Sequence, residues 1–178
     1  MSPDPSRGSF RTNGFRKEPR RRQVAVIGGS GIEEGSEAWT LAEEVGRGLA
    51  EAGVTVVCGG GGGVMEAASR AAAEAGGEVI GIVPGDSPDD ANEHCTHVVA
   101  TGIGHARNLA VVSSGAAVIA IGGEWGTLSE IGFARVIGHE VVALRSWRLD
   151  GRDRVAGAPG VTTAETAAEA VAAALATL

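Results

Sequence analysis

Residues 116–130 have the sequence AAVIAIGGEWGTLSE, in which an apolar run is followed by a glycine turn and a polar segment. An unbroken apolar run of this kind is typical of a strand buried on both faces of a parallel sheet. Gly122 and Gly123 allow the backbone to turn sharply and to approach a ligand closely, and Thr127 is expected to cap a helix that begins there. A strand, a glycine turn and a helix start together form a site for an anion. Glu124 and Glu130 lie at the two ends of this turn, and Glu130 adds a candidate reactive carboxylate.

The same succession of apolar run, glycine turn and helix occurs twice earlier in the chain. Strands are expected at residues 24–27, 54–58, 79–83, 96–100, 116–121 and 141–144, and a short extended piece is expected near Val161. Helices are expected at residues 36–52, 64–75, 105–114, 127–138 and 164–177, the last of them capped by Thr163. This alternation predicts an α/β fold, Rossmann-like and doubly wound, with a mainly parallel sheet and helices on both faces. Ligands of such sheets bind at the carboxyl ends of the strands, where all three glycine turns are expected to lie.

Charge divides the 178 residues into two parts. Residues 1–22 carry a net charge of +5 and are interpreted as a flexible basic N-terminal arm, for which a solvated tail is favoured over an arm that binds nucleic acid or a partner. Residues 23–178 carry −12 and are expected to form a single Rossmann-like ligand-binding domain. Such an acidic body disfavours nucleic-acid binding, and no apolar run is long enough to span a membrane. Two cysteines without a disulfide framework suit a cytoplasmic protein.

The first two glycine turns favour a ligand other than a dinucleotide. The first turn, Gly28-Gly29-Ser30-Gly31, does not match G-x-G-x-x-G, and Cys58 and Gly59 stand where a dinucleotide enzyme has an acidic residue, so NAD and FAD are disfavoured. The second turn is Gly59-Gly60-Gly61-Gly62-Gly63. Five consecutive glycines lose much backbone entropy on ordering, and close approach of a phosphate or a flat ring explains them better than a structural loop. Cys58 is interpreted as a small buried apolar residue.

Arg107 is the strongest candidate for a direct ligand contact. It falls in the first turn of an expected helix, where a positive charge is unfavourable unless an anion compensates it. A bidentate contact with a phosphate or a carboxylate is therefore favoured, whereas His105 is expected to cap the helix or to face solvent. A metal site in His94-Cys95-Thr96-His97 is disfavoured, because strand alternation separates His94 from the other two candidate ligands. Lys17 is the only lysine in the sequence, so residues 23–178 cannot form a pyridoxal phosphate Schiff base.

Three motifs together resemble the LOG (lonely guy) superfamily of Rossmann-like proteins, whose members often carry the label lysine decarboxylase. They are Gly59–Ala67, Ala106-Arg107-Asn108 and Gly122–Glu130, and the resemblance extends over residues 23–145. One branch hydrolyses nucleoside 5′-monophosphates and has an Arg-Lys pair and the motif Pro-Gly-Gly-x-Gly-Thr-x-x-Glu. A second branch, which includes the molybdenum cofactor carrier proteins, has Ala-Arg-Asn and Gly-Thr-Leu-Ser-Glu and resembles this chain more closely. The departures from the hydrolase pattern are Asn108, Ile121, Ser129 and one extra residue between Gly123 and Gly126.

The resemblance implies a homo-oligomer, dimer or tetramer, that carries or stores a phosphorylated small molecule, with molybdenum cofactor as the expected ligand. The alternative is a phosphoribohydrolase that splits AMP or a cytokinin nucleotide into base and ribose 5-phosphate, with Arg107 and Glu130 as its catalytic residues. A third hypothesis is a nucleotide sensor whose basic arm binds a partner. The expected ligand-binding residues are Gly28, Gly29, Ser30, Gly31, Gly60, Gly61, Gly62, Gly63, Met65, Arg107, Asn108, Gly122, Gly123, Glu124, Gly126, Thr127 and Glu130.

Overall fold

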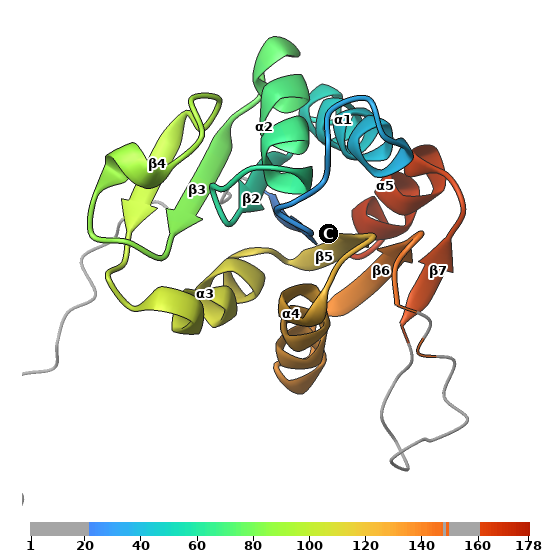
Figure 1. Cartoon of the computed structure of the whole chain (residues 1–178). Coiled ribbons are helices and arrows are strands. Elements are labelled where there is room, and N and C mark those ends of the chain that lie inside the picture. The colour runs from blue at the N-terminus through green and yellow to red at the C-terminus, as the bar shows by residue number, and fades with distance from the viewer. Residues whose placement is uncertain (1–21, 148, 150–160) are drawn as a thin grey trace, which may run out of the picture.

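Seven strands form one sheet in the order β4-β3-β2-β1-β5-β6-β7 (Figure 1). The computed structural model describes residues 22–147, 149 and 161–178. Every neighbouring pair of strands is parallel, so the predicted doubly wound α/β fold is confirmed. The strands are β1 (Gln23–Gly28), β2 (Thr55–Cys58), β3 (Val79–Val83), β4 (His97–Ala100), β5 (Ala117–Ile121), β6 (Glu140–Leu144) and β7 (Thr162–Ala164).

Helices cover both faces of this sheet, as predicted. The helices α1, α2 and α5 pack on one face and α3 and α4 on the other, which divides the apolar core into two layers (Figure 1). The α-helices are α1 (Glu37–Glu51), α2 (Val64–Glu74), α3 (Arg107–Ser114), α4 (Trp125–Val136) and α5 (Ala167–Leu175), and the short 3-10 helices are η1 (Pro88–Asp90) and η2 (Gly104–Ala106).

Two helix starts differ from the sequence-based expectation. Helix α4 begins at Trp125 with Glu124 as its N-cap, so Thr127 lies inside the first turn and does not cap the helix. The reason is that Gly122 and Gly123 adopt positive φ angles of 53° and 111°, which turn the chain within fewer residues than expected.

Thr163 likewise does not cap the last helix. It pairs with Ala143 as the central residue of β7, an edge strand that the sequence indicated only as a short extended piece near Val161. The N-cap is Thr166, whose hydroxyl accepts a hydrogen bond from the Glu169 amide at 3.2 Å. The predicted basic arm lies outside the described residues, apart from Arg22. None of the helices in the described part combines the length and the apolar character needed to cross a membrane.

A close contact between α1 and α2 depends on Gly46. A Cβ added at Gly46 would collide with the carbonyl oxygen of Ala68 on α2, and Gly46 is buried within α1. Glycine at this position therefore lets the two helices approach closely. By contrast, Gly132 on the outer side of α4 is exposed, and a Cβ there would meet nothing within 4 Å.

We expect Gly46→Ala to lower the free energy of unfolding by about 1–3 kcal/mol, because the added methyl group overpacks the contact between α1 and α2. Gly132→Ala is the matched control and is expected to raise it by about 0.5–1 kcal/mol through helix propensity alone. Urea denaturation of both variants measures the difference. Equal stabilisation by the two substitutions would contradict the close helix contact.

Candidate functional site

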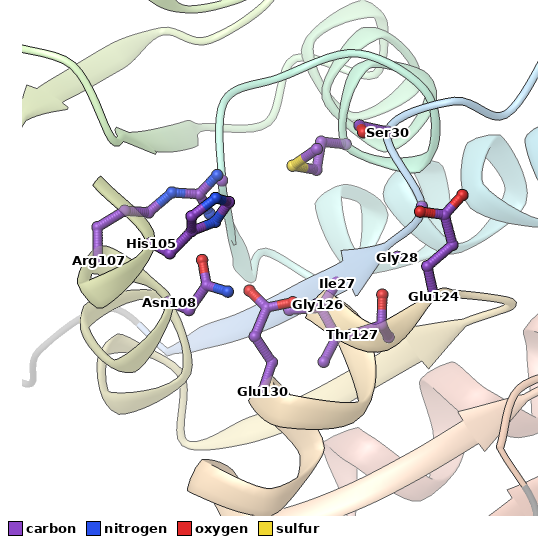
Figure 2. Close-up of a pocket in the computed structure, with 13 residues that line it drawn as sticks. Ile27, Gly28, Ser30, His105, Arg107, Asn108, Glu124, Gly126, Thr127 and Glu130 are labelled. Carbon is purple, nitrogen blue, oxygen red and sulfur yellow. The ribbon is translucent and has the colours of Figure 1, made fainter.

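A cavity of about 150 Å³ lies at the carboxyl ends of β1, β2 and β5 (Figure 2). The chain runs from β1 toward one edge of the sheet and from β5 toward the other edge, so the cavity lies at the point where the strand order reverses. Ligands of open α/β sheets bind at such a point. The cavity is lined by Ile27, Gly28, Gly29, Ser30, Gly59, Met65, His105, Arg107, Asn108, Glu124, Gly126, Thr127 and Glu130.

Most of the residues that the sequence assigned to a ligand site gather around this cavity. Figure 2 shows Arg107 and Asn108 on α3, across from Glu124, Thr127 and Glu130 at the start of α4. The expected residues that line the cavity are Gly28, Gly29, Ser30, Met65, Arg107, Asn108, Glu124, Gly126, Thr127 and Glu130. The expected residues that do not line it are Gly31, Gly60, Gly61, Gly62, Gly63, Gly122 and Gly123.

The structure gives several of these remaining glycines a packing role instead of a place at the cavity. Gly63 has a φ of 63°, and a Cβ there would collide with the carbonyl oxygen of Gly29. Gly123 has a φ of 111°, and its Cβ would lie 2.5 Å from that of Thr127. The glycine-rich turn after β2 is thus needed to let α2 start against the turn after β1.

Ile27, Gly59 and His105 also line the cavity. Gly59 directly follows β2 and begins the glycine turn at which the close approach of a ligand was expected. The sequence did not single out Ile27, the second-to-last residue of β1, and its position at a strand end was the signal that could have found it. His105 lies in η2 and is exposed, in agreement with one of the two roles expected for it.

Arg107 occupies the space that glycine leaves at position 59. A Cβ on Gly59 would lie 2.7 Å from the central guanidinium carbon, so only glycine accommodates the side chain there. The Nε atom of Arg107 is buried and has no hydrogen-bond partner. Burial lowers the pKa of the guanidinium, and the nearby Glu130 carboxylate partly opposes this shift. A buried donor without a partner is unfavourable, and an anion in the cavity would supply the missing acceptor.

Glu130 is the second buried ionisable group of the cavity, with 7% of its surface exposed. Burial raises the pKa of its carboxyl group to about 7, against a lowering by the positive charge of Arg107 and a further rise from Cys58. Glu130 and Arg107 form no ion pair within 4.0 Å. Each therefore shifts the pKa of the other through a longer-range electrostatic interaction. A carboxyl group that titrates near neutral pH can donate or accept a proton, and in its neutral form it does not repel an anionic ligand.

Backbone amide groups add further hydrogen-bond donors to this candidate anion site. The N-cap residues of α4 and α2, Glu124 and Gly63, provide no side-chain cap. The amide groups in the first turn of each helix therefore keep free donors, apart from the Val64 amide, which donates to the Gly29 carbonyl at 3.1 Å. Gly126 and Thr127 belong to the first turn of α4 and Met65 to that of α2, and all three line the cavity. Helix starts attract anions through these amides and through the helix dipole.

The histidines near Cys95 do not form a metal site with it in the described residues, where no group of three His, Cys, Asp or Glu side chains could hold a metal ion. Strand β4 begins only at His97, so the alternation expected for residues 94–97 does not apply. His97 is exposed and contacts the Thr96 hydroxyl at 3.1 Å.

The chain is similar to a protein-family model, to a curated protein and to solved structures. A model of the SLOG cluster4 family matches residues 21–176. A probable cytokinin riboside 5′-monophosphate phosphoribohydrolase from Oryza sativa subsp. japonica is 36% identical over 115 residues, which cover 63% of this chain and 47% of the rice protein. The chain thus spans about half the length of that relative.

Two solved structures are similar over almost their whole length. The molybdenum cofactor binding protein from Rippkaea orientalis is 28% identical, with a TM-score of 0.78 and coverage of 89% of this chain and 98% of that chain. The molybdenum cofactor carrier protein from Chlamydomonas reinhardtii is 28% identical, with a TM-score of 0.75 and the same coverage of 89% and 98%.

The raised pKa of Glu130 predicts a pH-dependent stability. Between pH 4.5, the ordinary value, and about pH 7, the folded state holds a proton that the unfolded state has released. Stability therefore falls as the pH rises through this window, and the loss is complete above it. We expect Glu130→Gln to raise the free energy of unfolding at pH 8, by at most about 3 kcal/mol, and to leave it unchanged at pH 4.

Urea denaturation at the two pH values measures this difference. Glu93→Gln, in an exposed loop position, is the matched control and is expected to have no effect at either pH. A Glu130→Gln variant that is equally stabilised at pH 4 and pH 8 would contradict a neutral Glu130 in the folded protein.

Proposed function

The chain belongs to the SLOG cluster4 family, and we propose that it binds a phosphorylated small molecule in the cavity between α3 and α4, as a carrier or storage protein for molybdenum cofactor. The observation that carries this proposal is the buried Nε of Arg107, a donor without a partner beside the free amides of two helix starts. Phosphate is the biological anion that such donors hold most readily.

Molybdenum cofactor is the favoured ligand because two structurally similar proteins are described as binding or carrying it. The residues of this cavity fit such a cargo. Asn108 and Thr127 are buried polar side chains that line the cavity and make no hydrogen bond within the described part of the chain. They are available to the polar edge of a pterin, while Arg107 and the helix starts hold the phosphate. A carrier needs only slow release and shielding of its cargo.

The alternative is a nucleoside 5′-monophosphate phosphoribohydrolase, and the specific observation in its favour is the pKa of Glu130 near 7. In that reaction Arg107 would hold the phosphate or the base. Glu130 would orient the attacking water, and its carboxylate would stabilise the positive charge that develops on the ribose as the bond to the base breaks. The rice relative supports this alternative by its description, whereas Asn108, Ile121 and Ser129 depart from the hydrolase motifs.

We also propose that the protein is a cytoplasmic homo-oligomer. Helix α4 exposes Phe133 and Val136 on its outer side, next to the exposed C-cap residue Ile137, and Val136 has 84% of its surface exposed. Apolar side chains that lie together on an exposed helix are typical of a surface covered by another chain, and a second copy is the expected occupant. Size-exclusion chromatography with light scattering tests this assembly.

The ligand can be identified by mass spectrometry of the small molecules released from the purified protein. We expect a phosphorylated pterin from the wild-type protein and its loss from Arg107→Ala. With AMP as a soluble probe, we expect Arg107→Ala to weaken binding about 10- to 100-fold, the loss typical of a hydrogen bond to a charged group. Arg47→Ala is the matched control, because Arg47 is exposed and pairs with Glu74 at 3.6 Å away from the cavity.

Adenine release from AMP separates the carrier from the hydrolase. The carrier hypothesis predicts no adenine above the background of the Arg107→Ala variant. Adenine release that is abolished in both Glu130→Gln and Arg107→Ala would reject a pure carrier. Binding of AMP and pterin that is equal in the wild type and Arg107→Ala would reject the proposed anion site in either form.

A further inference from the structure

The two cysteines of the chain lie next to each other beneath the glycine turn after β2, although 36 residues separate them in the sequence. The hydroxyl of Ser69 on α2 lies between them, 3.4 Å from the Cys58 sulfur and 4.0 Å from the Cys95 sulfur. Cys58 is the last residue of β2, and Cys95 precedes β4. Both are free thiols.

The sheet brings the two side chains to the same face. Gly81 on β3 pairs with Cys58, and paired residues of neighbouring strands point the same way. A Cβ on Gly81 would lie 2.6 Å from the Cys95 sulfur, so the Cys95 side chain fills the space beside Cys58 that Gly81 leaves free. Cys58 is fully buried, whereas Cys95 is partly exposed.

The two thiols differ in pKa, as is typical of cysteine pairs that take part in thiol–disulfide exchange. A hydrogen bond from Cys95 lowers the pKa of Cys58 to about 7, against the effect of burial. The same interaction with Cys58 raises the pKa of Cys95. Cys58 therefore ionises more readily than an isolated cysteine, and Cys95 keeps its proton more firmly. The thiolate is the reactive form of cysteine.

Hydrogen bonds connect this pair to the glycine turn. The Gly60 amide donates to the Cys58 sulfur at 3.4 Å. The Cys95 sulfur lies 3.6 Å from the Asn92 side-chain oxygen, which is the alternative acceptor for its single proton. Asn92 in turn holds the glycine turn, because its backbone amide donates to the Gly60 carbonyl at 2.7 Å and its side-chain amide to the Gly61 carbonyl at 2.9 Å. The turn begins at Gly59, against which the guanidinium of Arg107 packs.

We propose that Cys58 and Cys95 form a reversible disulfide that loosens the glycine turn of residues 59–63. Bond formation brings the two sulfurs together, removes the Cys95 proton that Asn92 can accept, and removes the negative charge of the Cys58 sulfur that accepts from Gly60. The disulfide itself is independent of the ligand. Its effect on ligand affinity, through the support of Arg107 by Gly59, rests on the proposed function.

A small-molecule disulfide such as oxidised glutathione is a sufficient oxidant. Where Cys58 is a thiolate it takes the proton of Cys95, and the partly exposed Cys95 thiolate then attacks one sulfur of glutathione disulfide. The S–S bond of glutathione breaks, and a mixed disulfide and one glutathione thiolate result. That thiolate takes the proton from Cys58, whose sulfur then attacks the Cys95 sulfur and releases the second glutathione, which is protonated by solvent. Two protein thiols are oxidised, and one glutathione disulfide is reduced to two thiols.

The test uses the full chain in glutathione buffers of increasing oxidation, quenched with an alkylating agent under denaturing conditions. We expect the reduced protein to gain two alkyl groups and the oxidised protein none, with no retained glutathione and no covalent dimer. A digest without reductant is expected to contain one peptide pair that joins Cys58 to Cys95. Cys95→Ser is the control, and its Cys58 is expected to stay open to alkylation in every buffer.

Hydrogen exchange measured by mass spectrometry tests the effect on the turn. We expect peptides that cover residues 59–65 to exchange about 5- to 10-fold faster in the oxidised wild type, as for the loss of about one hydrogen bond, and at an unchanged rate in Cys95→Ser. Two alkylated cysteines in every buffer, a stable glutathione adduct or a covalent dimer would overturn the disulfide. A disulfide with unchanged exchange of residues 59–65 would overturn its action on the turn. Neither measurement needs a ligand, so either failure is distinct from a failure of the proposed function.

Discussion

The guanidinium of Arg107 is held half-buried at the start of α3, where desolvation and the helix dipole both disfavour its positive charge. Its Nε has no partner, and Glu130 is too far away to form an ion pair with it. The folded chain thus keeps a cation without an ion-pair partner beside free backbone amides. A phosphate in the cavity would satisfy the donor, offset the dipole and make use of the amides at the same time. The desolvated charge at a helix start and the buried donor without a partner are both unfavourable in the free protein, and they are the physical basis for expecting an anionic ligand.

The remainder of the fold keeps that charge in its position. Parallel strands place the ends of β1, β2 and β5 at one edge of the sheet, and the reversal of strand order between β1 and β5 opens a crevice there. Gly59 is needed because any side chain would displace the guanidinium. Burial keeps the pKa of Glu130 near 7, so this carboxyl group can be neutral when an anion is bound. The proposed anion binding and the proton transfer of the hydrolase alternative therefore depend on the same two residues, Arg107 and Glu130.

Alternation of apolar runs and glycine turns was sufficient to predict the parallel sheet, its helices and the edge at which the cavity lies, because both patterns are local. Arg107 could be singled out because its position at a helix start is also local. The caps at Thr127 and Thr163 were wrong, since the tight turn at Gly122 and Gly123 and the pairing of β7 with β6 decide where those helices begin.

What the sequence could not resolve depends on contacts between distant segments. Gly60 and Gly63 were expected at the ligand, but the structure gives Gly63 a packing role against Gly29, and neither residue lines the cavity. The proximity of Cys58 and Cys95 likewise follows only from the packing of β2, β3 and α2.

In the proposed complex, Arg107 and the start of α4 hold the phosphate of the ligand. A crystal structure of the wild-type protein grown with AMP tests this arrangement most directly. We expect phosphate oxygens within hydrogen-bonding distance of Arg107 Nε and of the amide of Gly126 or Thr127. A phosphate bound elsewhere, or a cavity that holds AMP while Arg107 makes no contact with its phosphate, would contradict this arrangement.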